Sequence, residues 1–319
     1  MKKIVLLLIG LLAVNAWAGE PLMLVKPGRE IFVNFPSAIL PDKAITVFLP
    51  EESVPLHQKY PVVYLLGVWP KDAPAAEAVL KQASRKAILV GLNVEESDLA
   101  DPAKMVSFFS QELVPYIDSN YPTLDEPSFR VIGARGAAAV RVLGGLLARK
   151  QLFGRALIVN SGADTVSFAA ADKKLRVLAA GSRAQMAALW KTLQGIKFAY
   201  GKQVALRIMP DASLFDVLNL DYLFAPEEEL AVAEVGGNLS AKKLFIASTE
   251  KTEFSTWVKL RNAMRFDYIA LDLRIAPPYL RWDAAAGVLQ PIAGAGAGKV
   301  KISVAVDKAV FSTKLKLKK

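Results

Sequence analysis

The stretch of residues 129–162 constrains the fold of this chain more than any other. It begins with a short apolar run at residues 129–132, which is typical of a buried strand. A glycine-bounded turn follows at residues 133–136, and an alanine- and leucine-rich segment then continues to about Lys150 with the composition of a helix. A second apolar run occupies residues 156–159. A strand, a tight turn, a helix and a second strand predict one unit of a parallel α/β sheet.

The same alternation extends over most of the first 225 residues. Strands are expected at residues 29–35, 44–50, 60–67, 87–92, 129–132, 155–160, 175–180 and 203–209. Helices are expected at residues 73–86, at 105–120 before Tyr121-Pro122, after the glycine turn, at 183–194 and near 213–223. After an opening hairpin, this order predicts an α/β fold with a mostly parallel sheet and helices on both faces.

The first 18 residues predict a secretory signal peptide. Lys2 and Lys3 form a basic head, residues 4–14 are apolar, and Ala16-Trp17-Ala18 supplies a small-residue cleavage site. This apolar run is too short to span a bilayer, which takes about 20 residues. We therefore expect a protein that is exported to the periplasm or secreted, with no transmembrane segment in its mature chain.

The composition indicates well-buried cores and a basic surface. Apolar residues make up 53% of the chain, which argues against disorder, and the absence of cysteine excludes disulfides and thiolate chemistry. The formal net charge is +10, and loss of Lys2 and Lys3 with the signal peptide would leave +8. Such a surface favours anionic neighbours such as phospholipid headgroups or acidic glycans, although solubility alone is the simpler explanation.

Residues 28–224 resemble the esterase D branch of the α/β-hydrolases, which includes S-formylglutathione hydrolases, feruloyl esterases and mycolyltransferases. The resemblance rests on an ordered series of segments: residues 35–50, 59–67, 112–122 (ELVPYIDSNYP), 152–154 (LFG) and 161–162 (SG). It implies an α/β-hydrolase fold with a serine on a tight strand-to-helix turn, the nucleophile elbow.

The elbow of this chain has no serine. The elbow pattern Gly-x-Ser-x-Gly corresponds here to Gly133 through Ala137, so Arg135 stands at the serine position. Ala137 replaces the second glycine and indicates that the strained turn has relaxed. Ser161 and Ser182 lie near strand ends, but neither has the glycine pattern or a base to activate it.

The other positions that the resemblance implies are changed as well. Residues 182–184 (Ser-Arg-Ala) stand where the acid is implied, and residues 210–213 (Pro-Asp-Ala-Ser) stand where the histidine is implied. Residues 67–69 (Gly-Val-Trp) replace the His-Gly pair of the oxyanion loop. His57 is the only histidine, and we expect it in a loop at the opposite end of the sheet. We therefore expect no catalytic residues and a pseudoenzyme of this family.

Arg135 is expected to point from the start of a helix into the former cleft. The helix dipole disfavours a cation there unless an acid or an anion meets it. One explanation is an ion pair with a nearby carboxylate or a guanidinium in solvent. The other is an anion-binding site formed by Arg135 and the helix N–H groups. The vestigial elbow thus comprises Gly133, Arg135 and Ala137.

Past residue 225 the pattern changes to short alternating runs. An acidic, glycine-containing linker is expected at residues 226–240. Strands are then expected at residues 243–247, 253–260, 266–275, 279–282, 288–291, 299–306 and 310–317, which predicts a β-sandwich. Residues 254–264 fit an amphipathic helix as an alternative, which would give a βαβ annex.

A second resemblance favours the sandwich. Residues 277–289 (PPYLRWDAAAGVL) and the glycine-rich turn at 294–298 are similar to cadherin-like and immunoglobulin-like modules. Calcium ligation in such modules needs carboxylate clusters, whereas Asp283 and Asp307 are expected as turn residues. We therefore expect no metal and no cofactor.

The last strands carry a basic patch, Lys314, Lys316, Lys318 and Lys319. Lysines that alternate with leucines predict a half-buried strand with a basic outer face. Such lysines protect sheet edges against aggregation, or they form a patch that faces a membrane or a glycan. Aromatic residues are not interleaved with them, so no nucleic acid is expected.

The sequence as a whole predicts a signal peptide (1–18), an esterase-like domain (19–225), a linker (226–240) and a β-sandwich (241–319). The favoured function is non-catalytic, as a binding or scaffolding subunit of a cell-envelope assembly with protein partners and an anionic envelope surface nearby. Two alternatives are an active esterase or acyltransferase with displaced catalytic residues, and a small-ligand receptor that uses the cleft around Arg135.

Overall fold

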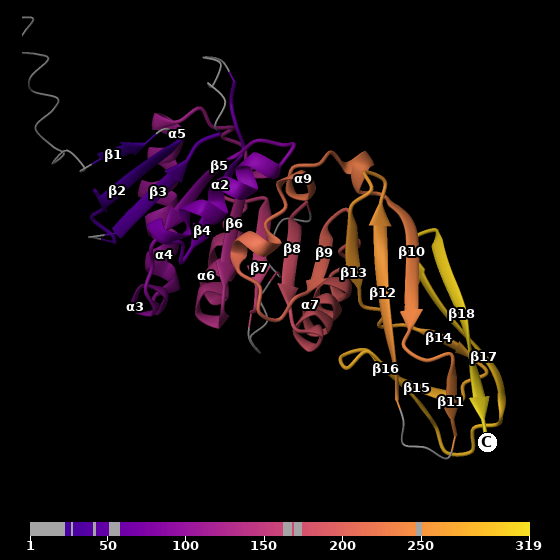
Figure 1. Ribbon diagram of the computed structural model, residues 1–319. Coiled ribbons are helices and arrows are strands. Elements are labelled where there is room, and N and C mark those ends of the chain that lie inside the picture. Colours follow the sequence, from indigo (N-terminus) through magenta and orange to yellow (C-terminus); the bar gives the residue numbers. More distant parts are fainter. Residues whose placement is uncertain are drawn as a thin grey trace, which may run out of the picture.

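The computed structural model describes residues 23–26, 28–40, 43–50, 58–161, 168, 174–246 and 251–319. One mixed sheet of 14 strands runs across the molecule, and a second sheet of four strands lies at the end that holds the C-terminus (Figure 1). The predicted signal peptide and His57 lie outside the described residues, so the expectations about them stay predictions.

Six parallel strands form the middle of the large sheet. In spatial order they are β5 (Ile88–Leu92), β4 (Val62–Leu66), β6 (Arg130–Arg135), β7 (Arg155–Val159), β8 (Arg176–Gly181) and β9 (Val204–Ile208). Antiparallel strands extend the sheet beyond β5: β3 (Lys43–Phe48), β2 (Arg29–Phe35) and β1 (Met23–Lys26). Every residue of β4, β5 and β8 is buried, as expected for apolar strands that are covered on both faces.

Helices connect these strands and cover both faces of the sheet. They are η1 (Pro70–Asp72), α2 (Ala73–Gln82), α3 (Glu96–Leu99), α4 (Pro102–Phe108), η2 (Phe109–Leu113), α5 (Val114–Asn120), η3 (Pro127–Phe129), α6 (Ala137–Ala148), α7 (Arg183–Gly195), α8 (Leu214–Val217) and α9 (Leu220–Leu223). Right-handed crossovers place α2 on one face of the sheet and α6 and α7 on the other. In agreement, α4 packs against α6, and α2 packs against α8. The alternation of strands and helices that the sequence predicts is therefore confirmed.

Two short helices replace the single helix expected near residues 213–223. Ser213 caps α8, because its hydroxyl accepts the N–H of Asp216 at 3.2 Å. Asn219 caps α9 in the same way, because its side-chain oxygen accepts the N–H of Tyr222 at 2.8 Å. A second capping residue with extended backbone interrupts the helix and starts a new one.

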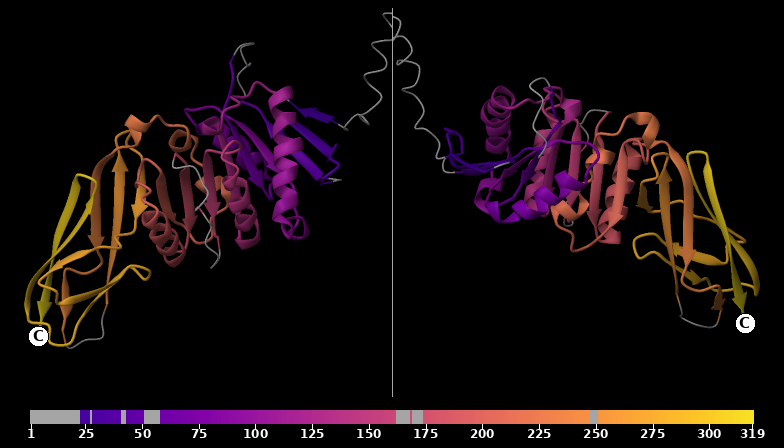
Figure 2. Two further views of the ribbon diagram at one scale, coloured as in Figure 1. Left: turned by 180° about the vertical axis from the view of Figure 1, so that it is seen from behind. Right: turned by 45° about the horizontal axis from the view of Figure 1, so that its top comes forward.

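In the described residues after α9, the elements are strands, apart from the short turn η4 (Glu227–Leu230). β13 (Arg265–Tyr268) pairs with β9, and the large sheet continues through β12 (Thr252–Leu260), β16 (Val288–Pro291) and β15 (Leu280–Asp283), with β10 (Val232–Leu239) beside β12. The small sheet has the order β11 (Lys243–Phe245), β18 (Ala309–Lys318), β17 (Gly298–Val306) and β14 (Arg274–Ala276). Figure 2 shows this strand-rich part at the opposite end of the molecule from the first strands. The fold is thus an α/β-hydrolase-like fold followed by a C-terminal β-sandwich.

The segment expected as a linker is instead part of the sheet. β10 pairs along its length with β12, with Gly236 opposite Trp257 and Gly237 opposite Thr256. A Cβ atom on Gly236 would lie 2.1 Å from the Trp257 ring, and one on Gly237 would lie 2.8 Å from the Phe254 ring. The two glycines therefore provide room for aromatic side chains. The prediction that they belong to a linker was wrong.

The alternative helix at residues 254–264 does not form. β12 alternates buried and exposed side chains from Thr252 to Leu260, as a strand with two different faces does. The run at residues 266–275 was expected as one strand, but it divides into β13 in the large sheet and β14 in the small sheet. The break between them lets the chain cross from one layer of the sandwich to the other.

Two apolar clusters hold the molecule together. The larger one fills both faces of the parallel sheet and includes residues of the C-terminal strands, among them Val258, Phe266 and Val304. The smaller one lies within the strand-rich part and comprises Leu244, Phe254, Leu280, Leu289, Val300, Ile302, Leu315 and Leu317. Because the larger cluster crosses residue 225, the two parts of the chain share one core. Over the part of the chain that the structure describes, no helix has the length and apolarity needed to cross a membrane.

Candidate functional site

The carboxyl ends of β4, β6 and β7 meet at one edge of the sheet, where a cavity of about 420 Å³ opens. Open parallel α/β sheets bind their ligands at this edge. The cavity is lined by Leu66, Gly67, Val68, Asp72, Arg135, Gly136, Asn160, Ser213, Leu214 and Phe215. The structure therefore brings together the elbow, the loop after β4 and the loop after β9, as the hydrolase resemblance implied. We call this space the elbow cavity.

The turn at Arg135 is relaxed. Arg135 is the last residue of β6 and pairs with Val159 of β7. Among the described residues, the non-glycine positions with positive φ are Asn160, Lys197, Ala263 and Asp307, so Arg135 is free of this strain. The positive φ of 83° falls on Gly136, which tolerates it. The relaxation expected from Ala137 is therefore observed in the backbone.

The Arg135 side chain is exposed and has no ion pair with a described residue. No carboxylate oxygen of the described residues lies within 4 Å of its guanidinium, and no hydrogen bond from it is formed within those residues. Asp216 is close enough for the charge of Arg135 to influence its pKa. Hydrogen bonds from Ser213 lower the pKa of the Asp216 carboxyl, and the charge of Arg135 contributes to the same effect. Within the described residues, Arg135 is thus a cation without an ion-pair partner beside the elbow cavity.

The backbone N–H groups that would stabilise an oxyanion are engaged elsewhere. Gly136 donates its N–H to the carbonyl oxygen of Val159 at 2.9 Å. Gly67 and Val68 both donate to the carbonyl oxygen of Leu92, at 2.9 and 3.3 Å. In an active hydrolase, the residue after the nucleophile and the loop after the central strand supply these donors to the substrate. Here the donors stabilise the turns themselves.

The serines near this edge serve as structural groups. Ser182 caps α7, since its hydroxyl accepts the N–H of Gln185 at 3.3 Å. Ser213 caps α8, and its hydroxyl donates to the carboxylate of Asp216 at 2.8 Å. Ser161 is buried, with 6% of its surface exposed. No histidine occurs among the described residues, so none of the three serines has a histidine base there.

Arg183 occupies the position where the family's acid is implied, and it serves a different purpose. Its Nε donates to the carbonyl oxygen of Ala284 at 3.0 Å, and its guanidinium lies 5.7 Å from the centre of the Trp282 ring. Burial lowers the pKa of Arg183, while Asp267 and Asp283 oppose this shift. The Arg183 side chain therefore connects the start of α7, beside the parallel sheet, to the strand-rich part. This contact leaves no local pattern in the sequence, because its two sides are about 100 residues apart.

Asn160 is a site residue that the sequence analysis missed. It follows β7 with a left-handed φ of 49°, which asparagine tolerates better than most residues. Its Nδ2 donates to the carbonyl oxygen of Ala212 at 3.4 Å, but its buried Oδ1 accepts no hydrogen bond from a described residue. As far as the described residues go, the wall of the elbow cavity therefore holds an acceptor without a donor, on the residue that follows the strand partner of Arg135.

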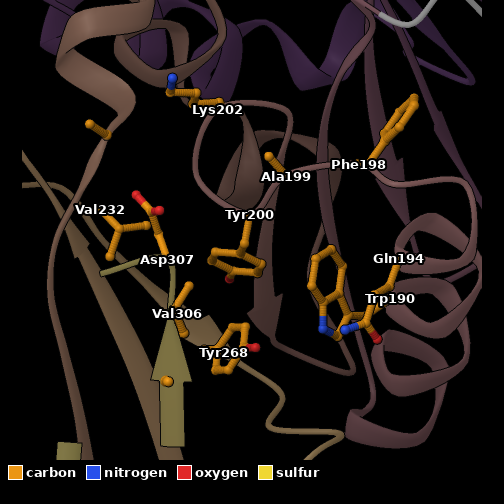
Figure 3. A pocket seen from close by; sticks show the side chains of 12 residues that line it. Trp190, Gln194, Phe198, Ala199, Tyr200, Lys202, Val232, Tyr268, Val306 and Asp307 are labelled. Atoms are coloured by element: carbon orange, nitrogen blue, oxygen red, sulfur yellow. The ribbon is translucent and has the colours of Figure 1, made fainter. Parts of the chain in front are cut away.

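A second cavity, of about 450 Å³, lies between α7, the loop before β9 and the strand-rich part (Figure 3). The aromatic side chains in its wall pack against one another and connect α7 to the strand-rich part. The ring of Tyr200 packs edge to face against those of Trp190 and Tyr268, at 5.4 and 5.0 Å. The Tyr200 hydroxyl donates to the carbonyl oxygen of Asp267 and accepts the N–H of Leu206. Burial raises the pKa of Tyr268 to about 12.

The remaining predicted site residues lie elsewhere. Lys314, Lys316 and Lys318 are on β18 and Lys319 follows it, at the far end of the molecule from the elbow (Figure 1). Gly133 lies inside β6, where a Cβ atom would be 2.6 Å from the Leu65 side chain. Within the described ranges, no group of three or more His, Cys, Asp and Glu side chains is placed to hold a metal ion.

Comparisons with known proteins give several partial matches. Among solved structures, a ferulic acid esterase is 16% identical with a TM-score of 0.45, covering 60% of this chain and 93% of that one. An IroE-like serine hydrolase from Shewanella oneidensis is 16% identical with a TM-score of 0.45, covering 60% and 76%. The enterobactin esterase from Shigella flexneri is 16% identical with a TM-score of 0.45, covering 56% and 53%. A search of curated protein sequences finds no match.

One family model matches this chain. It is described as "Putative esterase" and matches residues 37–209, which is more than half of the sequence. The matched region begins before β3 and ends just after β9, so it contains every strand that contributes to the elbow cavity. This chain therefore belongs to that esterase family.

Proposed function

We propose that this chain is a catalytically inactive member of the esterase family and that it acts by binding. The observation that carries the proposal is Arg135 at the nucleophile position, at the end of β6 and in an unstrained backbone. A guanidinium has no lone pair with which to attack a carbonyl carbon, and its charge is permanent at physiological pH. Covalent catalysis at this position is therefore ruled out by the chemistry of the side chain.

The surroundings of Arg135 support the same conclusion. The N–H groups of Gly136 and Val68 are hydrogen-bonded to backbone carbonyls and are unavailable to a developing oxyanion. The loss of one such donor typically lowers kcat by about 10² to 10³. The nearby serines cap helices or are buried, and none has a histidine beside it among the described residues. The nucleophile position and the oxyanion donors are thus both altered, and the described residues supply no histidine base.

The favoured role is that of an exported binding or scaffolding subunit of a cell-envelope assembly. The N-terminal segment with the features of a signal peptide supports export. The C-terminal sandwich supports a role in protein contacts, since its sequence resembles cadherin-like and immunoglobulin-like modules that commonly serve in adhesion and assembly. Arg183 and the shared core attach this sandwich firmly to the esterase-like part.

Hydrolysis of short-chain p-nitrophenyl esters by the mature chain tests the proposal. We expect the buffer rate at every pH and no labelling by a fluorophosphonate probe, with an active esterase of the family as a positive control. Activity that disappears in Ser161→Ala, Ser182→Ala or Ser213→Ala would overturn the proposal. Such a result would identify the chain as an esterase or acyltransferase with displaced catalytic residues.

The elbow cavity favours a second candidate function, that of a small-ligand receptor. In a space of about 420 Å³ it combines the guanidinium of Arg135 with a buried oxygen of Asn160, and neither group has a partner among the described residues. A ligand with a carboxylate and a neighbouring N–H or O–H group would satisfy both residues. A thermal-shift screen of small carboxylates on the wild type and on Arg135→Gln distinguishes this receptor from a pure scaffold.

A further inference from the structure

All charged side chains on the strands of the small sheet are positive. Its four strands, all of them described, contain no aspartate or glutamate. They contain seven basic residues, which we call the basic face: Lys243, Arg274, Lys299, Lys301, Lys314, Lys316 and Lys318. Six of the seven side chains are exposed, and Lys318 is half-buried. The set is larger than the C-terminal lysines that the sequence analysis singled out.

The strand register places all seven side chains on one side of the sheet. Lys316 is directly opposite Lys299 on β17 and directly opposite Lys243 on β11. Lys301 is likewise opposite Lys314. Residues that face each other across a ladder point to the same side, and so do residues two apart along a strand. The same two rules place Arg274 and Lys318 on this side. Arg274 pairs with Ser303, which is two residues from Lys301, and Lys318 is two residues from Lys316.

The other side of the same sheet is apolar. Val300, Ile302, Leu315 and Leu317 alternate with the lysines and are at most 1% exposed. They pack into the smaller core cluster. The register of the sheet is therefore fixed by its inner side, and the basic side chains are held outward.

This arrangement is unfavourable for the isolated protein. Like charges directly opposite each other on neighbouring strands destabilise a sheet. None of the seven side chains forms an ion pair within 4 Å with a described acidic residue. Edge protection does not explain Lys316, because Lys243 and Lys299 flank it on both sides within the sheet. An external anion would remove the repulsion.

We propose that the basic face docks onto the anionic phospholipid headgroups of a membrane surface. A sheet side with a regular array of cations offers many weak contacts to a layer of phosphates. Six of the seven cations are lysines, which act as flexible point charges, whereas recognition of one defined anion in a pocket usually relies on the planar fork of arginine. The basic face lines neither of the two cavities described above.

Two further observations fit a membrane. Phe245 is 47% exposed at the margin of the basic face, and the ammonium group of Lys318 lies 5.9 Å from the centre of its ring. Aromatic side chains are enriched where a protein surface meets lipid headgroups. The strands β11, β17 and β18 lie at the far end of the molecule from β6 (Figures 1 and 2). Docking through the basic face would therefore leave the elbow cavity at the end of β6 accessible. The inference is independent of whether the elbow is catalytic.

Vesicle co-sedimentation of the full mature chain tests the proposal. We expect binding to vesicles that contain phosphatidylglycerol and none to vesicles of phosphatidylcholine alone. The bound fraction should fall as salt is raised from 0.01 to 1 M, because the Debye length shortens from about 30 to about 3 Å. No binding to the anionic vesicles, or equal binding to both, would overturn the proposal.

A charge-reversal pair identifies the face. Lys299→Glu with Lys314→Glu places a carboxylate opposite Lys316 and another opposite Lys301, so the melting temperature should stay the same or rise. Vesicle binding should fall at least tenfold. The matched control is Lys81→Glu with Lys104→Glu, which changes the net charge equally at exposed positions of α2 and α4 and should leave binding near that of the wild type.

Two outcomes of this series would contradict the proposal. Equal losses in both double variants would show that net charge alone, and no defined surface, attracts the vesicles. Binding to a soluble acidic polysaccharide without binding to vesicles would assign the face to a glycan. If the glutamate pair fails to fold, Lys299→Gln with Lys314→Gln provides the same comparison, with retained binding again counting against the proposal.

Discussion

The backbone N–H of Gly136 lies 2.9 Å from the carbonyl oxygen of Val159 and donates a hydrogen bond to it. In an active α/β-hydrolase, the N–H of the residue after the nucleophile stabilises the oxyanion of the substrate. In this chain it closes the turn between β6 and α6 onto the end of β7. The change at Arg135 is thus accompanied by a change in the backbone, and a single substitution would not reverse both.

Arg135→Ser should therefore fail to create an esterase. The new hydroxyl would have no histidine among the described residues to take its proton, and the N–H groups of Gly136 and Val68 would still be occupied. We expect hydrolysis of p-nitrophenyl butyrate at the rate of buffer, as for the wild type and for Arg135→Ala. Turnover by the serine variant that the alanine variant lacks would show that an intact oxyanion site and base remain.

Arg135→Gln should leave the free energy of unfolding within about 0.5 kcal/mol of the wild type. The guanidinium is exposed and has no ion pair with a described residue, so its removal strands no buried charge. Urea denaturation measures this difference. A loss of about 3 kcal/mol would instead reveal a buried carboxylate partner.

The Arg135→Gln variant also distinguishes a small-ligand receptor from a scaffolding protein. A panel of small carboxylates is screened by thermal unfolding of the wild type and of Arg135→Gln. Stabilisation of the wild type alone would support the receptor, because glutamine cannot replace the charge-assisted hydrogen bonds of Arg135. Stabilisation of neither protein is the result expected for a scaffold.

The fold could be predicted from the sequence where local pattern and tertiary environment agree. The continuous apolar runs that predicted strands at residues 60–67 and 87–92 became β4 and β5, which are buried along their whole length. Lysines alternating with Leu315 and Leu317 likewise predicted a half-buried strand, and β18 has these two faces. The periodicity of apolar residues is sufficient to predict such strands, because burial alone determines which of their residues are apolar.

The failures have a different physical origin. β10 was missed because Gly236 and Gly237 indicate a linker until Trp257 and Phe254 are seen packed over them. Asn160 was missed because an unsatisfied side-chain oxygen is a property of its neighbours. The gathering of Arg135, the loop after β4 and the loop after β9 was anticipated only through resemblance to a family. Contacts between distant segments leave no periodic signal in the sequence.

Removal of the strand-rich part should destabilise the esterase-like part. β9 pairs with β13, and the N–H of Ile208 donates to the Asp267 carboxylate at 2.8 Å. The Phe266 ring also packs 5.0 Å from the buried Tyr222. A chain of residues 19–225 loses these contacts and exposes β9 as an edge, so we expect a loss of more than about 3 kcal/mol.

Thermal unfolding of residues 19–225 and 19–319 makes the comparison. Equal melting temperatures would show that the strand-rich part folds as a separate unit, as the linker expected at residues 226–240 implied. Limited proteolysis of the longer chain gives a second readout. Because residues 232–239 form β10 and are paired with β12, protease should spare them while the protein is folded.

Arg155 and Arg176 provide a pair of substitutions with opposite expected effects. The two residues face each other directly on β7 and β8. Burial lowers the pKa of Arg155 to about 9, and the neighbouring charge of Arg176 contributes. Among the described residues, the Arg155 guanidinium has no hydrogen-bond or ion-pair partner and lies 5.6 Å from the centre of the Phe224 ring. It is a desolvated cation beside another cation.

Arg155→Met should therefore stabilise the protein by about 1 kcal/mol, because methionine keeps the packing of the side-chain stem and removes the charge. Arg176→Met should do the reverse. The Nη1 of Arg176 donates to the carbonyl oxygens of Tyr222, Leu223 and Ala225 at 3.0, 2.8 and 2.8 Å. Its loss leaves the buried carbonyl oxygens of Leu223 and Ala225 without a donor, whereas that of Tyr222 keeps the N–H of Ala225 at 3.3 Å, and should cost at least about 3 kcal/mol. Urea denaturation at pH 7 measures both changes, and destabilisation of similar size in the two variants would show that the contact of Arg155 with Phe224 outweighs the repulsion.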